Sequence, residues 1–387
     1  MAFSGSGTGN DWRMALEQAL AGAPRDGNDL VFFFASQDFA SDYLPMAATL
    51  VDQLAPRVLI GCSGQGVIAT GVEIEEQPGL SVMALSLPGA DLHRARLLGK
   101  DLDALHTPEE WHRRLGRAPS EVNAWVVLSD PYTIDTDALV EGLSQAYPGC
   151  PVVGGMASGN PRWRGTHLFV DGQVYPEGAV LLAVGGPWTV RTVVSQGAEP
   201  IGETWTITDA DRNLLKGLGG RAPLEVLMET MKRLSPEMQQ RASRNLLIGL
   251  AMDEYKDEFG RGDFLIRNLM GADKTTGIIA IGALPRVGQT LQFQVRDAHA
   301  ADAELSAMLE QAAEELGPVA PAGALLCSCN GRGRGLFREP HHDATAVDRQ
   351  FAGLPVAGFF CNGEIGPVAG KTFVHGFTAS IAFFVPV

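Results

Sequence analysis

The chain has 387 residues, of which 45% are hydrophobic and 19% are charged, and this balance excludes a disordered chain. Its formal net charge of −15 disfavours nucleic acid and anionic membrane surfaces as partners, because both are negatively charged themselves. A chain of this length is expected to fold into more than one domain, each with its own core.

The N-terminal stretch MAFSGSGTGNDW lacks the basic segment and apolar run of a secretory signal, and no later apolar run is long enough to span a membrane. Residues 3–11, rich in glycine and serine, are expected to be disordered, within a disordered or peripheral segment over 1–27. The five cysteines are an odd number spread thinly along the chain, which favours reduced thiols over a disulfide framework. These features predict a soluble, cytoplasmic protein.

One pattern occurs three times: an apolar strand, a helix, a second apolar strand that runs into a glycine-rich turn, and a third apolar strand. The three strands of each copy are expected at 30–36, 57–66 and 80–87, at 124–130, 150–159 and 179–185, and at 323–331, 354–366 and 378–384. The helices are expected near 42–54, 137–146 and 344–351. Continuous apolar strands indicate burial on both faces, so the pattern predicts an α/β fold with mixed β-sheets, flanking helices and two domains.

A different pattern separates the second and third copies. Residues 222–240 have the apolar spacing of a helix, which we expect to open the second domain, and an amphipathic helix is expected over 300–317. Four apolar segments between these helices are expected to form strands: 245–253, 263–271, 277–284 and 290–297.

Several motifs of the second half occur in a fixed order: FLIRNLMGAD (264–273), LQFQVRDA (291–298), CNGRGRGLF (329–337), EPHHD (339–343) and VAGFFCNGEIGPV…FVHGFTASIAFF (356–384). With these motifs the chain resembles the C-terminal half of FIST-domain proteins. The N-terminal half of the same family is resembled more weakly, through IGCSGQG (60–66) and VVGGMASG (152–159).

The resemblance implies a FIST N-terminal domain over 28–221 and a FIST C-terminal domain over 222–387. It further implies a stand-alone sensory protein that binds a small polar ligand, an amino acid or a related molecule, in a cleft near the interface of the two halves. Because no output domain accompanies these halves, the resemblance also implies a separate signalling protein as partner.

The predicted ligand site lies in and beside the stretch 357–384, where polar side chains of both signs accompany glycine backbone. A carboxylate fits Lys371 or backbone N–H groups, and an ammonium group fits Glu364 or Asn362. Asn330 and Arg332 follow a strand end and are expected to face the same cavity. The full predicted set is Asn330, Arg332, Phe360, Cys361, Asn362, Glu364, Lys371, His375 and Thr378. The structural alternative is that Glu364 pairs with Lys371 and the glycines only make turns.

Other chemistries draw on the same region. A zinc site is disfavoured, because the Cys-x-Cys pair has no second pair to complete the ligand set that Cys327, Cys329, Cys361, His341 and His342 would form. Some FIST relatives are haem-binding nitric oxide sensors, which makes non-covalent haem with an axial ligand from His341, His342 or His375 an alternative. Without a recognisable catalytic motif, neither enzymatic activity nor a required cofactor is expected. A scaffold that recognises another protein is the third alternative.

Overall fold

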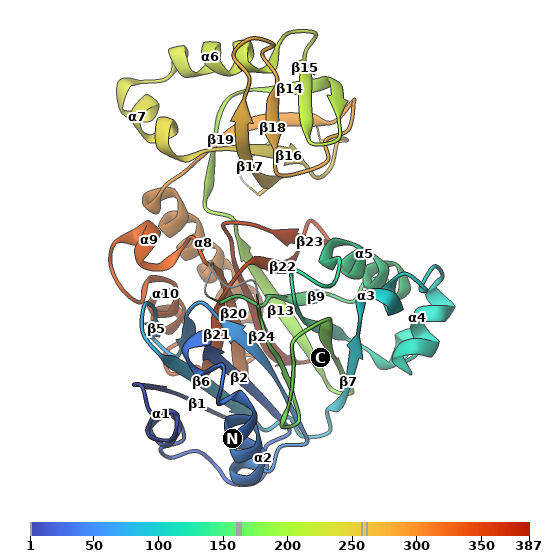
Figure 1. The fold of residues 1–387 in the computed structure, drawn as a ribbon, viewed down its shortest axis with the longest axis vertical. Helices are drawn as coiled ribbons and strands as arrows, with labels where there is room; N and C mark the ends of the chain where they lie inside the picture. Colours follow the sequence, from blue (N-terminus) through green and yellow to red (C-terminus); the bar gives the residue numbers. More distant parts are fainter. Residues whose placement is uncertain (1, 160–164, 257, 261) are drawn as a thin grey trace. The chain divides into compact units, whose positions relative to one another are not determined.

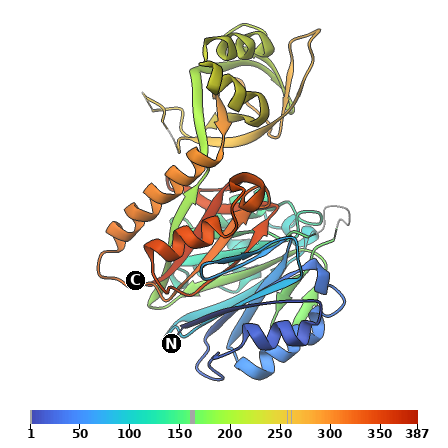
Figure 2. The same ribbon diagram turned by 90° about the vertical axis from the view of Figure 1, so that its left-hand side faces the viewer.

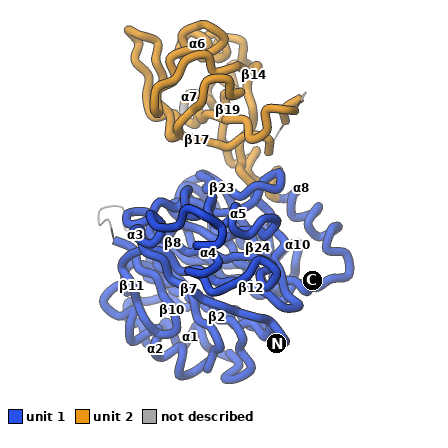
Figure 3. Tube along the Cα trace, turned by 90° about the vertical axis from the view of Figure 1, so that its right-hand side faces the viewer, with its two compact units in different colours: residues 1–194, 306–387 blue, residues 195–305 orange. Residues whose placement is uncertain are grey.

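The computed structural model describes residues 2–159, 165–256, 258–260 and 262–387 (Figure 1). They form two compact units, one of residues 1–194 with 306–387 and one of residues 195–305 (Figure 3). Mixed sheets with flanking helices in two units confirm the predicted fold class. The units do not follow the boundary at 221–222, because the third copy of the repeat belongs to the same unit as the first two.

Three six-stranded sheets build the larger unit, and all have the same strand order. In each sheet the first two strands of one copy are parallel neighbours, and the third strand pairs antiparallel with the first. These strands are β2 (Leu30–Ser36), β3 (Val58–Gly64) and β6 (Gly79–Leu85), then β8 (Ala124–Ser129), β9 (Val152–Met156) and β12 (Ala179–Gly185), then β20 (Gly323–Cys329), β21 (Val356–Cys361) and β24 (Ala379–Pro386). The repeat predicted from the sequence is therefore present.

Each copy also gives a β-hairpin to the sheet of another copy, in a closed cycle. The hairpin of the first copy, β4 (Val67–Ala69) with β5 (Val72–Ile74), extends the third sheet at β21. The second hairpin, β10 (Leu168–Val170) with β11 (Gln173–Tyr175), extends the first sheet at β3. The third, β22 (Gly363–Val368) with β23 (Lys371–His375), extends the second sheet at β9. Segments expected to be glycine-rich turns are thus hairpins that join the copies.

A further strand lies at the opposite edge of each sheet: β1 (Ala2–Thr8), β7 (Asp91–Leu97) and β13 (Trp188–Ser195). The expected disorder of residues 3–11 is wrong, because β1 pairs antiparallel with β6 along its whole length. Its small residues have a packing role: a Cβ at Gly5 or Gly7 would overlap the backbone of α1 (Trp12–Ala19).

Helices cover the outer faces of the sheets. In Figure 2, α1 and α2 (Tyr43–Leu54), both blue, lie on the outer face of the first sheet. The second sheet carries α4 (Pro108–Leu115) and α5 (Thr136–Ala146), and a short helix, α3 (Gly99–Leu102), precedes them. In the third copy the expected helix is α10 (His342–Gln350), and a shorter helix, α9 (Gly333–Phe337), precedes it.

The inner faces of the three sheets share one apolar core, to which Phe32, Val126 and Leu325 contribute equivalent side chains. The close packing of each parallel pair depends on a glycine in its second strand. A Cβ at Gly61, Gly154 or Gly358 would overlap the carbonyl oxygen of the residue opposite in the first strand. This repeated requirement explains why the same small residue recurs in the three copies.

The smaller unit is a closed barrel with two helices. Its strands are β14 (Ala198–Asp211), β15 (Leu214–Leu218), β16 (Leu246–Ala251), β17 (Phe264–Ala272), β18 (Ile279–Ile281) and β19 (Thr290–Arg296). The helix expected over 222–240 is two helices, α6 (Pro223–Arg233) and α7 (Pro236–Asn245), because Pro236 ends one helix and begins the next. The barrel leads into α8 (Ala298–Leu316), and no helix of the described residues is long and apolar enough to cross a membrane.

Candidate functional site

Three of the predicted ligand residues lie where the second strands of the three copies end. The Asn330 side chain donates to the Asn362 side chain over 2.8 Å, and the Asn362 amide donates to the Ala157 carbonyl over 3.1 Å. Phe360 is buried, and its N–H donates to the Gly66 carbonyl over 3.0 Å. The structure therefore brings Asn330, Phe360 and Asn362 together at a junction of all three copies, and their binding of a ligand stays a prediction.

Ser158 completes this junction. The Ser158 N–H donates to the Ser63 carbonyl over 3.1 Å, and its hydroxyl accepts the Gln65 N–H over 2.8 Å and donates to the Phe360 carbonyl. The Asn362 N–H donates to the Met156 carbonyl over 3.1 Å. These bonds join the three strand ends in a cycle. Direct backbone hydrogen bonds join the second copy to the first and the third copy to the second. Between the first and third copies, the Ser158 hydroxyl bridges the Gln65 N–H and the Phe360 carbonyl, in place of a direct hydrogen bond between those two groups.

We expect Ser158→Ala to lower the free energy of unfolding by about 2 kcal/mol, because it removes the hydroxyl that bonds both the partly buried Gln65 N–H and the buried Phe360 carbonyl. Urea denaturation followed by circular dichroism measures the change. Ser144→Ala is the matched control, since the Ser144 hydroxyl only donates to the Val140 carbonyl within its own helix. Equal stability of the two variants would contradict the role given to the Ser158 hydroxyl.

Arg332, predicted to face the ligand cavity, instead forms a buried ion pair. Its guanidinium donates to both carboxylate oxygens of Asp343 over 2.7 and 2.8 Å, and both side chains are 0% exposed. Ser328 and His342 also bond this carboxylate, over 2.7 and 2.9 Å. Burial alone would raise the pKa of Asp343, but the charge and hydrogen bonds of Arg332 hold that pKa far below its ordinary value. Arg332 thus fixes α10 to the end of β20.

A second buried carboxylate lies beside this pair. Glu73 of β5 is 4% exposed, its Oε1 accepts the Ala344 N–H over 3.0 Å, and its own N–H donates to His341 Nδ1 over 2.9 Å. Burial, reinforced by the negative charge of Asp343, raises the pKa of Glu73 to about 7. The hairpin of the first copy is therefore held to α10 of the third through a group that titrates near neutral pH.

Four further predicted residues, Cys361, Glu364, His375 and Thr378, are buried at the base of the β22–β23 hairpin. The Glu364 carboxylate accepts the Thr378 N–H over 3.1 Å, and His375 Nε2 lies 2.9 Å from the Gly366 carbonyl oxygen. The Thr378 hydroxyl donates to the Gly376 carbonyl. Glu364 is opposite His375 in the ladder, and Lys371 is at the other end of the hairpin, so Glu364 does not pair with Lys371. Whether these buried side chains bind a ligand stays a prediction.

The thiols and imidazoles considered for metal or haem have packing partners. Burial and a hydrogen bond with Cys327 raise the pKa of the Cys361 thiol, and both side chains lie in the core shared by the three sheets. His342 stacks on Phe337. Among the described residues, no group of three or more His, Cys, Asp or Glu side chains is arranged to hold a metal ion.

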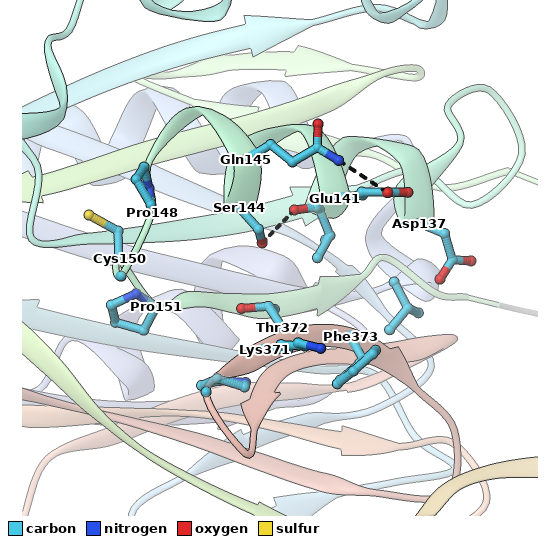
Figure 4. A pocket seen from close by; sticks show the side chains of 15 residues that line it. Asp137, Glu141, Ser144, Gln145, Pro148, Cys150, Pro151, Lys371, Thr372 and Phe373 are labelled. Carbon is cyan, nitrogen blue, oxygen red and sulfur yellow. Dashed lines mark hydrogen bonds between the residues drawn. The ribbon is translucent and has the colours of Figure 1, made fainter. Parts of the chain in front are cut away.

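A groove of about 770 Å³ lies between α5 and the β22–β23 hairpin (Figure 4). Lys371 is the predicted residue that lines it, and it projects from the hairpin beside Thr372 and Phe373. The facing helix α5 begins because the Asp135 side chain accepts the Ala138 N–H. It presents four polar residues to the groove, Asp137, Glu141, Ser144 and Gln145.

The groove combines apolar walls with opposite charges. Val140 and Val374 are buried in it, and Pro148 and Pro151 close the end opposite Asp137 in Figure 4. Glu141 accepts a hydrogen bond from Gln145 over 3.2 Å and is exposed, like Lys371 on the facing wall. The residues of α5 could not be recognised from the sequence, because an acidic face on an amphipathic helix is the ordinary signature of a solvated surface.

In comparisons with known proteins, each half of the chain matches the model of a known domain. The model of the FIST N domain matches residues 29–221, and that of the FIST C domain matches residues 223–367. "Uncharacterized protein Rv0628c" of Mycobacterium tuberculosis is 42% identical over 371 residues, which cover 96% of this chain and 94% of that protein. "Uncharacterized protein Mb0898c" of Mycobacterium bovis is 42% identical over 351 residues, covering 91% of this chain and 88% of that protein.

A solved structure also aligns over the whole length. It is cyanuric acid hydrolase from A. caulinodans, which covers 100% of this chain and 99% of its own at 10% identity and a TM-score of 0.38. A likeness at this level extends to neither ligand nor activity. The two matched domains and the relatives at 42% identity show that the chain belongs to the FIST family.

Proposed function

We propose that this protein is a sensory module that binds a small zwitterionic ligand, an amino acid or a related molecule, in the groove between α5 and the β22–β23 hairpin. FIST domains are in general sensory modules for small ligands. The observation that carries the proposal is the presence of Lys371 and Glu141, of opposite charge, on opposite walls of one groove. A carboxylate fits the lysine, an ammonium group fits the glutamate, and Phe373 and Val140 provide apolar contact.

The two walls of the groove come from different halves of the chain, which also supports the proposal. Helix α5 belongs to the residues matched by the FIST N domain, whereas β23 comes from the third copy of the repeat, in the C-terminal half. A ligand that contacts both would favour one arrangement of the hairpin against the helix, and a separate signalling protein would respond to that shift. The buried residues at the base of the hairpin, Glu364 and His375 among them, would hold it in place during such a shift.

Lys371→Met is expected to abolish stabilisation by a bound amino acid. Screening the twenty common amino acids by thermal shift identifies the ligand, and a ligand present at a hundred times its dissociation constant adds about 2.7 kcal/mol to stability. The matched control is Lys100→Met, because Lys100 is an exposed lysine of α3 outside the groove. If no amino acid stabilises the wild-type protein, or if both variants respond equally, the proposed ligand class or site is wrong.

A further inference from the structure

The groove between α5 and the β22–β23 hairpin is longer than the charged part of an amino acid. Its lining follows α5 from Asp137 to Gln145, about 12 Å of helix, and continues past the end of the helix to Pro151. The ammonium and carboxylate groups of an amino acid are bonded to one carbon atom, so together they occupy a small part of this length. The rest of the groove is therefore available to the side chain of the ligand.

The two ends of the groove differ in charge (Figure 4). Asp137 lies at one end, four positions before Glu141 in α5 and thus on the same face of the helix. The segment 148–151, with the sequence Pro-Gly-Cys-Pro, lies at the other end and has no acidic or basic residue. Lys371 and Glu141, which fit the charged groups of the ligand, lie between these ends. A ligand bound to them extends its side chain toward either an acidic end or an uncharged one.

The thiol of Cys150 leaves the proline end uncharged. It donates a hydrogen bond to the Val122 carbonyl over 2.9 Å, and burial raises its pKa. Cys150 also packs against the buried apolar cluster to which Val140 and Val374 of the groove belong. The proline end therefore continues the apolar floor of the groove.

The same end is also preformed. The Cys150 N–H donates to the Tyr147 carbonyl over 3.1 Å, and the Trp125 N–H donates to the Pro151 carbonyl over 2.9 Å. The ring of each proline fixes its own backbone angle φ, so the segment 148–151 loses little conformational freedom when a ligand binds. An apolar side chain placed there is removed from water without the cost of ordering the wall.

We propose that the groove selects amino acids with a large apolar side chain, which lies along the segment 148–151 while the charged groups of the same ligand meet Lys371 and Glu141. This inference rests on the proposed function, because it uses the same groove and names the class of ligand within it.

The selection follows from the free energies of burial and of desolvation. Each methylene group that the ligand buries against the segment 148–151 raises its affinity roughly fourfold. A side-chain ammonium group in the same place loses water without meeting a carboxylate, because the acidic residues of the groove lie on α5. A long basic side chain would instead extend toward Asp137.

Titration calorimetry with the full-length protein tests the selection by measuring dissociation constants for alanine, norvaline, norleucine and lysine. Affinity is expected to rise with side-chain length from alanine to norleucine, by tenfold or more in total. Norleucine and lysine have the same carbon chain, and lysine adds the terminal ammonium group. Lysine is therefore expected to bind at least tenfold more weakly than norleucine.

Pro148→Glu locates the side chain of the ligand. Pro148 is exposed, and glutamate places a carboxylate at the uncharged end of the groove. The variant is expected to bind norleucine at least tenfold more weakly than the wild type, to bind lysine more tightly, and to bind alanine equally well. Pro318→Glu is the matched control, because Pro318 is an exposed proline outside the groove, and it should change none of these affinities.

The proposal is overturned if norleucine binds no more tightly than alanine, if lysine binds as tightly as norleucine, or if Pro148→Glu leaves the affinity for norleucine unchanged. In these cases amino acids still bind, so the proposed function stands without the selection. If none of these four ligands and none of the twenty common amino acids binds the wild-type protein, the proposed function fails and the selection fails with it.

Discussion

Replacing Asp343 with alanine is expected to lower the free energy of unfolding by about 3–5 kcal/mol, because it leaves the Arg332 guanidinium charged and buried without its partner. Arginine side chains stay charged at any usable pH, so Arg332 cannot relieve its burial by losing a proton. Ser328 and His342 lose the acceptor that they share with it. Urea denaturation followed by circular dichroism at pH 7 measures the loss.

Two comparisons separate the buried charge from a general effect of the substitution. Asp211→Ala breaks an exposed ion pair with Lys216, in which the aspartate side chain is 58% exposed, and should cost no more than about 1 kcal/mol. The double variant Arg332→Met, Asp343→Leu removes both charges and should be more stable than Asp343→Ala alone. A loss for Asp343→Ala as small as that for Asp211→Ala would contradict a water-excluded pair.

Glu73→Gln is expected to stabilise the protein above pH 7 and to flatten its stability between pH 4.5 and pH 7. The pKa of Glu73 is raised from 4.5 to about 7, so the folded protein holds a proton that the unfolded chain releases. The resulting stabilisation is fully present below about pH 4.5 and is lost as the pH rises through about 7. The difference corresponds to roughly 3 kcal/mol, which glutamine does not lose because it never ionises.

The measurement is the thermal midpoint of both proteins in steps from pH 4.5 to pH 8.5. Glu76→Gln is the matched control, because Glu76 is exposed just beyond the same hairpin, and its curve should follow that of the wild type. Asp343 does not interfere, since its low pKa places its own loss of stability at more acid pH. Parallel curves for wild type and Glu73→Gln would show that Glu73 does not carry the effect.

The strands of the repeat were predictable because each is a continuous apolar run, as in LVFFFAS of β2, and because a glycine recurs in the second strand of every copy. The exchanged hairpins were not, since a three-residue strand such as β4 has no periodicity of its own, and its partner β21 lies far away in the sequence. Its pairing depends on the closure of three sheets around one core, which local patterns do not encode.

The candidate site also contains residues that the sequence could predict and residues that it could not. Lys371 was predictable as a lone basic residue in a glycine-rich stretch, and it lines the groove. Its counterpart Glu141 was not, because α5 and β23 become neighbours only through the exchange of the third hairpin. Because Arg332 follows a strand, it was expected to bind the ligand. Instead, its guanidinium forms an ion pair with Asp343 of the nearby EPHHD motif. A buried ion pair and a ligand-binding arginine look alike in sequence.

The exchanged hairpins have a consequence for synthesis on the ribosome. The strand that receives β4 and β5 is β21, so these early strands wait for about 280 further residues before their partner exists, which takes roughly 15–60 s at ordinary translation rates. Until then the inner face of the first sheet lacks the third sheet, whose Phe384 and Phe359 contact Phe32 and Phe34 in the shared core. The nascent chain therefore depends on the strands of the third copy, and a message truncated before residue 356 leaves an apolar surface for chaperones to cover.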